Sequence, residues 1–92
     1  MKCNKQEVNS TLFTINYKKE LVKFKTDLFS KRKMNLNEFA IVVLGINPIS
    51  TEIIAMYIGK MGFDTYNKGL YDITITKKNR NGIQGRIRYN EK

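Results

Sequence analysis

The sequence contains no histidine and a single cysteine, Cys3. A lone thiol cannot form an intramolecular disulfide, and the absence of histidine excludes both a Cys/His zinc site and any mechanism that requires an imidazole. A Gly-rich phosphate loop and a carboxylate pair at catalytic spacing are also missing. We therefore expect a protein that is not an enzyme and that uses no metal and no cofactor.

Long hydrophobic runs are missing as well. The run from Phe39 to Leu44, which no other apolar run exceeds in length, is far too short to cross a bilayer. No apolar run follows the first lysines, so a signal peptide is not expected, and we predict a cytoplasmic protein without a membrane partner. Residues 1–7 are polar and predict a flexible tail, which leaves residues 8–92 as one domain.

Positive charge is what the chain has in excess. Seventeen Lys and Arg face eight Asp and Glu, a net charge of +9 over 92 residues. Residues 18–33 carry seven basic and two acidic side chains, and residues 73–92 carry six and one, so each segment has a net charge of +5. Residues 34–72 carry two basic and four acidic side chains, a net charge of −2. Such an excess repels itself, and nucleic acid is the commonest polyanion that relieves it.

The N-terminal third predicts a strand and then a helix. In residues 8–17, Phe13, Ile15 and Tyr17 alternate with polar residues, which favours a strand. In residues 18–31, apolar side chains recur at spacings of three and four with lysines between them, which is typical of an amphipathic helix.

The middle of the chain contains two helix-start signals. Asn35 followed by Glu38 resembles a capping box, and the run after it fits either a short buried helix ended by Gly45 or a buried strand. Asn47 as N-cap and Pro48 as first helical residue predict a second helix over residues 48–61, which Gly62 would end in the left-handed conformation.

The C-terminal third predicts a β-hairpin, because Ile73 and Ile75 alternate with polar residues, as do Ile83 and Ile87. A three-residue loop over residues 80–82 pairs Ile75 with Ile87 and Ile73 with Tyr89, which keeps apolar residues on one face.

Residues 36–63 resemble the helix-turn-helix of winged-helix DNA-binding proteins. The resemblance rests on Leu44-Gly45-Ile46 at the turn, on Asn47-Pro48 at the start of the next helix, and on Gly62-Phe63 at its end, with residues 69–90 following as a wing. It implies an α+β winged helix-turn-helix fold, with an N-terminal strand and helix before the motif and a C-terminal β-hairpin wing. Such proteins include bacterial, plasmid and phage regulators and partition adaptors of the TubR type.

The resemblance also implies how double-stranded DNA would be bound. Helix 48–61 would enter the major groove, and the basic wing 73–90 would contact the backbone and the minor groove. The expected reading residues are Ser50, Thr51 and Glu52, although local helix capping is a competing interpretation. The expected wing contacts are Lys77, Lys78, Arg80, Asn81, Arg86 and Arg88. The expected role is a small dimeric repressor or a centromere-binding partition adaptor, and the latter implies a filament-forming protein as a further partner.

Helix 48–61 carries two apolar stripes. One stripe, Ile54, Ile58 and Met61, is expected to pack on the core. The other, Ile53, Met56 and Tyr57, is expected to meet a second copy of the chain in a homodimer.

Two other hypotheses remain. The first is a βαβαββ two-layer α/β sandwich with residues 39–46 as a central strand, acting as a non-enzymatic module that binds protein or RNA. The second is a membrane-surface protein that uses a helix over residues 18–33. The conformation of residues 36–45 separates the first hypothesis from the winged helix.

Overall fold

The computed structural model describes residues 10–28, 31–47 and 50–89. The predicted tail, residues 1–7, lies outside these ranges. The elements, in chain order, are β1 (Ser10–Asn16), β2 (Leu21–Leu28), β3 (Lys31–Asn35), α1 (Leu36–Phe39), the π-helical turn η2 (Ala40–Leu44), α2 (Thr51–Gly59), β4 (Thr65–Lys68), β5 (Tyr71–Asn79) and β6 (Gly82–Tyr89).

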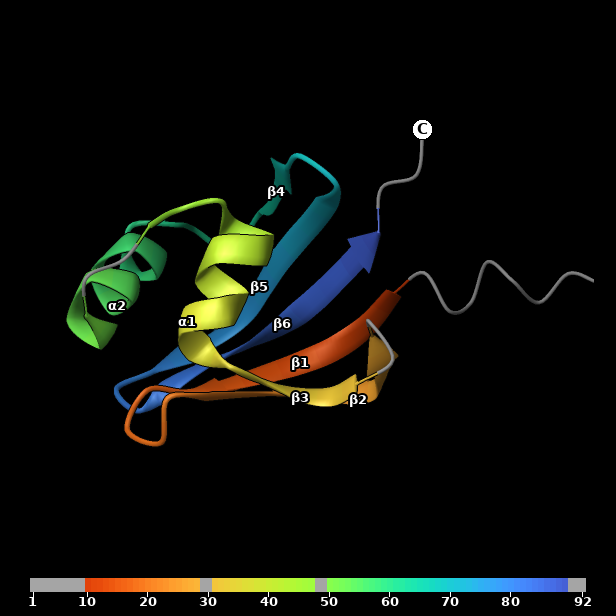
Figure 1. Cartoon of the computed structure of the whole chain (residues 1–92). Helices are drawn as coiled ribbons and strands as arrows, with labels where there is room; N and C mark the ends of the chain where they lie inside the picture. The colour runs from red at the N-terminus through yellow and green to blue at the C-terminus, as the bar shows by residue number, and fades with distance from the viewer. Residues whose placement is uncertain (1–9, 29–30, 48–49, 90–92) are drawn as a thin grey trace, which may run out of the picture.

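The six strands form one antiparallel sheet in the order β3-β2-β1-β6-β5-β4. Strands β1 to β3 are one meander and β4 to β6 are another, and the pairing of β1 with β6 joins the two edge to edge. The helices lie in the connection between the meanders and cover one side of the sheet (Figure 1).

The core lies between this side of the sheet and the helices. Successive side chains of a strand point to opposite faces, so each strand contributes alternate residues. The helical segments contribute Leu36, Phe39, Val43, Ile54 and Ile58, each at most 1% exposed. The strands contribute Phe13, Ile15, Val22, Phe24, Met34, Tyr71, Ile73, Ile75, Ile83 and Ile87 to the same cluster.

The winged helix-turn-helix prediction is wrong, because this sheet replaces its N-terminal helix and its isolated wing. Residues 17–20 form a turn and residues 21–28 form β2, not a helix over 18–31. Val22 pairs with Ile15 and Phe24 pairs with Phe13. Pairing with β1 therefore favours the two-residue alternation of a strand over the helical spacing of three and four.

The membrane-surface hypothesis is wrong in its structural basis, because residues 21–28 form a strand and not part of an amphipathic helix. No helix in the described ranges has the length and apolar character needed to cross a membrane.

Residues 36–44 are helical, so of the two conformations left open the structure has the helix and not the central strand. The βαβαββ sandwich, which requires that strand, is therefore wrong. The side chain of Asn35 accepts a hydrogen bond from the backbone N–H of Asn37, which confirms the predicted cap. Gly45, with φ of 72°, ends the segment in the left-handed conformation, as predicted.

The second helix is confirmed in position but not in its ends. Helix α2 begins at Thr51 with Ser50 as N-cap, not at residue 48 with Asn47 as N-cap; Pro48 itself lies outside the described residues. It ends at Gly59 with Lys60 as C-cap. The left-handed glycines are Gly45 and Gly69, so Gly62 does not have the predicted role.

The β5–β6 hairpin is confirmed, but its predicted register is wrong. Asn79 pairs with Gly82, which leaves a two-residue loop, and an irregularity between Ile75 and Lys77 shifts the pairing. Ile73 therefore faces Ile87 and not Tyr89. The shift is two residues, so the faces are preserved. Strand β6 also lies between β1 and β5, inside the sheet, so it is not part of a projecting wing.

Gly82 provides a test of the β1–β6 pairing. A Cβ at Gly82 would lie 1.7 Å from the carbonyl oxygen of Ile15, whereas a Cβ at Gly59 would meet nothing within 4 Å. Gly82→Ala should therefore lower the free energy of unfolding by about 1–3 kcal/mol through this clash. The control Gly59→Ala, at a helix position with open space, should raise it by ~0.5–1 kcal/mol. Urea denaturation measures both, and equal effects would contradict the β1–β6 geometry.

Candidate nucleic-acid interface

The face of the sheet opposite the helices, here called the open face, is strongly basic. Its position follows from alternation, because its side chains lie between residues buried in the core. Its described side chains include six basic residues and one acidic residue: Lys23, Lys25, Lys33, Lys77, Arg86, Arg88 and Asp72. The neutral members include Leu12, Thr14, Thr65, Asn67, Thr74, Thr76 and Gln84.

Two lysines of the open face oppose each other directly. Lys23 of β2 pairs with Lys33 of β3, and both are exposed. Like charges at directly opposite positions of an antiparallel pair are destabilising. An anion bound between the two ammonium groups would remove this cost, so the pair is suited to a phosphate group.

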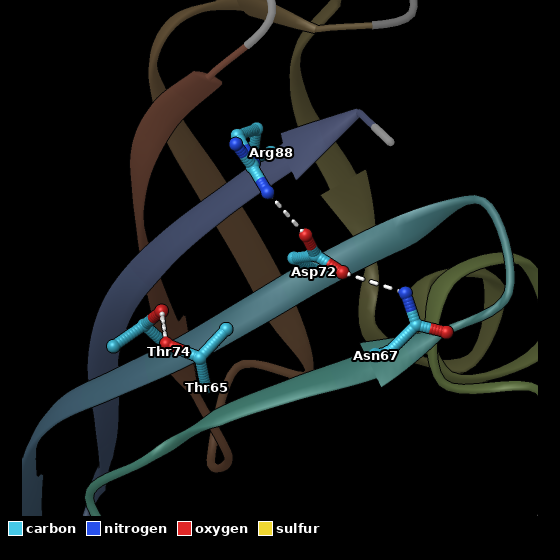
Figure 2. Close-up of polar contacts among 5 residues, drawn as sticks. All are labelled: Thr65, Asn67, Asp72, Thr74 and Arg88. Carbon is cyan, nitrogen blue, oxygen red and sulfur yellow. Dashed lines mark hydrogen bonds and ion pairs between the residues drawn. The ribbon is translucent and has the colours of Figure 1, made fainter. Parts of the chain in front are cut away.

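At the other end of the open face, a polar network links β4, β5 and β6 (Figure 2). Asp72 Oδ2 lies 2.6 Å from Arg88 Nη2, and Asp72 Oδ1 accepts a hydrogen bond of 2.8 Å from Asn67 Nδ2. The hydroxyls of Thr65 and Thr74 are 2.8 Å apart. Asp72 therefore pairs with the Arg88 guanidinium, which remains 60% exposed.

Between the two basic regions the open face is hollowed. A depression of about 310 Å³ lies over the centre of the sheet. The open-face side chains that line it are Leu12, Thr14, Lys23, Lys25, Thr76 and Gln84. Leu12 is 43% exposed, an unusual position for a large apolar side chain on a charged surface.

The predicted reading residues lie on the helix side of the sheet, where they have local contacts. Ser50 Oγ accepts a hydrogen bond of 3.4 Å from the backbone N–H of Ile53, and Thr51 Oγ1 donates one of 2.9 Å to Glu20 Oε2. Glu52 is exposed in the first turn of α2. The structure therefore separates these three residues from Arg86 and Arg88, which are on the opposite face.

The predicted wing residues divide into three groups. Lys77, Arg86 and Arg88 are on the open face, and Arg80 and Asn81 form the exposed tip of the hairpin. Lys78 is turned to the helix side. Its Nζ donates to the carbonyl oxygens of Gly59 and Met61 and lies 5.4 Å from the ring centroid of Phe63.

The second apolar stripe of α2 is partly exposed. Ile53 is 43% exposed and Met56 is 60% exposed, whereas Ile54 and Ile58 of the other stripe are buried as expected. Tyr57 is half-buried, and its hydroxyl accepts a hydrogen bond from Lys68 Nζ.

Two tyrosines have a side-chain pKa above the ordinary value. Burial raises the pKa of Tyr17, and burial together with the neighbouring Tyr89 raises the pKa of Tyr71. Both phenols therefore stay neutral at pH 7.

Sequence reasoning missed half of the open-face cations. Lys23, Lys25 and Lys33 were expected on or at the end of a helix, although Val22-Lys23-Phe24-Lys25 has the alternation of a strand. Comparison of the chain with protein-family models, curated proteins and solved structures gives no match.

The neighbours Lys77 and Lys78 provide a test of the two faces. Lys78→Met should lower the free energy of unfolding by about 1 kcal/mol. The carbonyl oxygens of Gly59 and Met61, at the end of α2, would lose the charged donor that the half-exposed Lys78 provides. Lys77→Met, a matched change on the open face, should stay within ~0.5 kcal/mol of the parent protein. Chemical denaturation measures both, and a larger loss for Lys77→Met would contradict the assignment of faces.

Proposed function

We propose that this protein is a non-catalytic, cytoplasmic DNA-binding protein that contacts the phosphate backbone through the open face of its sheet. The observation that carries the proposal is the charge of that face, six basic side chains against one acidic among those described. Phosphate contacts supply most of the affinity of a protein for DNA and do not depend on its sequence.

The dimensions of the open face support this proposal. Its basic side chains extend from β3 to β5, and strands lie about 4.8 Å apart, so the charged surface is roughly 19 Å wide. Arg86 is exposed at the middle of this surface, where it lies between Leu12 of β1 and Thr74 of β5. An extended charged surface of this kind suits a polymer of phosphates better than a single small anion.

The proposal differs from the expectation of a recognition helix. A duplex held on the open face does not reach Glu52 on the other side of the sheet, so α2 is not proposed as a reading element. The repressor and partition roles, and with them a filament-forming partner, rested on the resemblance to winged-helix proteins, and the six-stranded sheet removes that support.

Salt dependence tests the proposal. The logarithm of DNA affinity should fall linearly with the logarithm of salt concentration, with a loss on the order of a thousandfold between 50 and 200 mM for about six contacts. Arg86→Gln should weaken binding to different DNA sequences about equally and make the slope shallower by roughly one contact. Fluorescence anisotropy with labelled DNA measures both quantities.

Two control variants belong to this experiment. Lys60→Gln removes an exposed charge at the end of α2, and Glu52→Gln changes the former reading position. Neither should change affinity beyond the small effect of net charge. Affinity that is insensitive to salt would reject the proposal, and a larger loss for Lys60→Gln than for Arg86→Gln would move the interface to the helix side.

We further propose that the protein forms a homodimer through the helix side. Ile53 and Met56 of α2 are exposed there, as are Ile41 and Val42 of η2, at 51% and 47%. Several exposed apolar side chains on the helical segments of one side of a protein are typical of a protein–protein contact.

Sedimentation tests the homodimer. The parent protein should be dimeric at micromolar concentration without DNA, and Met56→Glu should make it monomeric, because burial of an unpaired carboxylate in the contact is costly. Leu70→Glu, at a turn residue that is 59% exposed, is the matched control and should stay dimeric. A monomeric parent protein would reject this proposal.

A further inference from the structure

The centre of the open face differs from its two sides. Strand β1 contributes no charged side chain there, and its open-face side chains at the depression are Leu12 and Thr14. Thr14 pairs with Lys23 on one side and with Gln84 on the other, and Leu12 pairs with Arg86. The depression over β1 therefore has a neutral floor, and Lys23 and Lys25 line it on the β2 side. On the β6 side the nearest described cation is Arg86, which pairs with Leu12 but does not itself line the depression.

The floor combines an apolar contact with hydrogen-bonding groups. Leu12, at 43% exposure, presents an apolar surface. The side chains of Thr14, Thr76 and Gln84 line the same depression. Hydroxyl and amide groups of this kind can bind the edges of nucleobases as donors or acceptors.

From this arrangement we infer that the depression over β1 receives unpaired nucleobases, and that the preferred ligand is single-stranded nucleic acid. In a duplex the bases are paired inside and the phosphates are outermost, so a recessed neutral floor gains no contact. In a single strand the bases turn toward the floor while the phosphates reach the flanking lysines and Arg86. The strands on either side of β1, β2 and β6, are roughly 10 Å apart, so both flanks are close to a strand that follows β1.

The composition of the floor also defines how the bases are bound. Among the described side chains of the open face none is aromatic, so the base stacking that many single-strand binders use is replaced by contact with Leu12. Binding is therefore tolerant of base sequence and dominated by phosphates. DNA and RNA share the required chemistry, namely a phosphodiester backbone with free bases.

This inference rests on the proposed function, and a comparison of ligands separates the two. Single-stranded DNA, single-stranded RNA and duplex DNA of one sequence and length are titrated by anisotropy at one salt concentration. We expect at least one single strand to bind about tenfold more tightly than the duplex. Duplex binding that is equal or tighter overturns the inference and leaves the proposed function standing, whereas binding of none of the three rejects both. RNA binding more tightly than DNA would identify RNA as the single-stranded ligand.

A substitution in the floor locates the site. Leu12→Ala should weaken single-strand binding about fivefold and leave duplex binding unchanged, because only free bases reach the floor. Leu70→Ala, at an exposed leucine in the turn between β4 and β5, is the matched control and should change neither affinity. Both positions are exposed, so both variants should fold, which circular dichroism checks. An unchanged single-strand affinity in Leu12→Ala overturns the assignment of the depression.

Cross-linking gives a second readout that does not depend on affinity. A single-stranded oligonucleotide with 5-bromodeoxyuridine should cross-link, on irradiation, to peptides that contain β1 and β6. Cross-links confined to α2 or η2 overturn the inference.

Discussion

The pairing of β1 with β6 is the contact on which the rest of the structure depends. It joins two meanders that are separated by the whole helical segment, and it places Ile15 opposite Ile83 in the core. A three-stranded meander alone has only a small apolar face. Joining two of them gives a six-stranded sheet whose larger apolar face can be buried under the helices. The close approach of β1 and β6 is possible because Gly82 carries no Cβ, which would lie 1.7 Å from the Ile15 carbonyl oxygen. Gly85 has the same role toward β5, where a Cβ would lie 2.3 Å from the Thr74 carbonyl oxygen.

This topology also explains why one face of the sheet is open. All the described helices come from one connection, between β3 and β4, and they pack on one side. Side chains on the other side remain in water. This exposure accounts for their polarity but not for the predominance of positive charge among them. Lys23 and Lys33 in direct opposition cost stability, and only one of the described acidic residues, Asp72, compensates six cations. The excess is more consistent with an anionic ligand than with solubility alone.

Sequence reasoning located much of the secondary structure. Strand β1, helix α2 and the β5–β6 hairpin follow from alternation, caps and glycines. For the segment after Asn35 the sequence left a buried helix and a buried strand open, and the structure has the helix. Strand β2 was missed because Leu21, Phe24 and Leu28 fit a helix while Val22 and Phe24 fit a strand, so the choice depends on β1, a partner distant in sequence. Strand β4 carries almost no signal, because Thr65–Lys68 is a short edge strand with little burial.

The open face was only partly predictable for a related reason. Net charge is a property of composition and does not depend on the fold, so the expectation of a polyanionic partner is unaffected by the correction from winged helix to sheet. The face on which a charge lies depends on register. The irregularity after Ile75 places Lys77 on the open face and Lys78 against the end of α2, although the two are adjacent and chemically identical.

The separation of the two faces has a consequence for assembly. Ile53 and Met56 are exposed on the helix side, and the cations are exposed on the opposite side. In a dimer formed through the helices, the two open faces would therefore point away from each other. Two sites on one rigid assembly bind a single ligand more tightly only if that ligand can reach both at once. A short oligonucleotide cannot pass around the dimer in this way, so it would gain no avidity. Such a dimer would instead hold two separate strands, or two distant segments of one long strand, and its geometry favours bridging over tighter binding at one place.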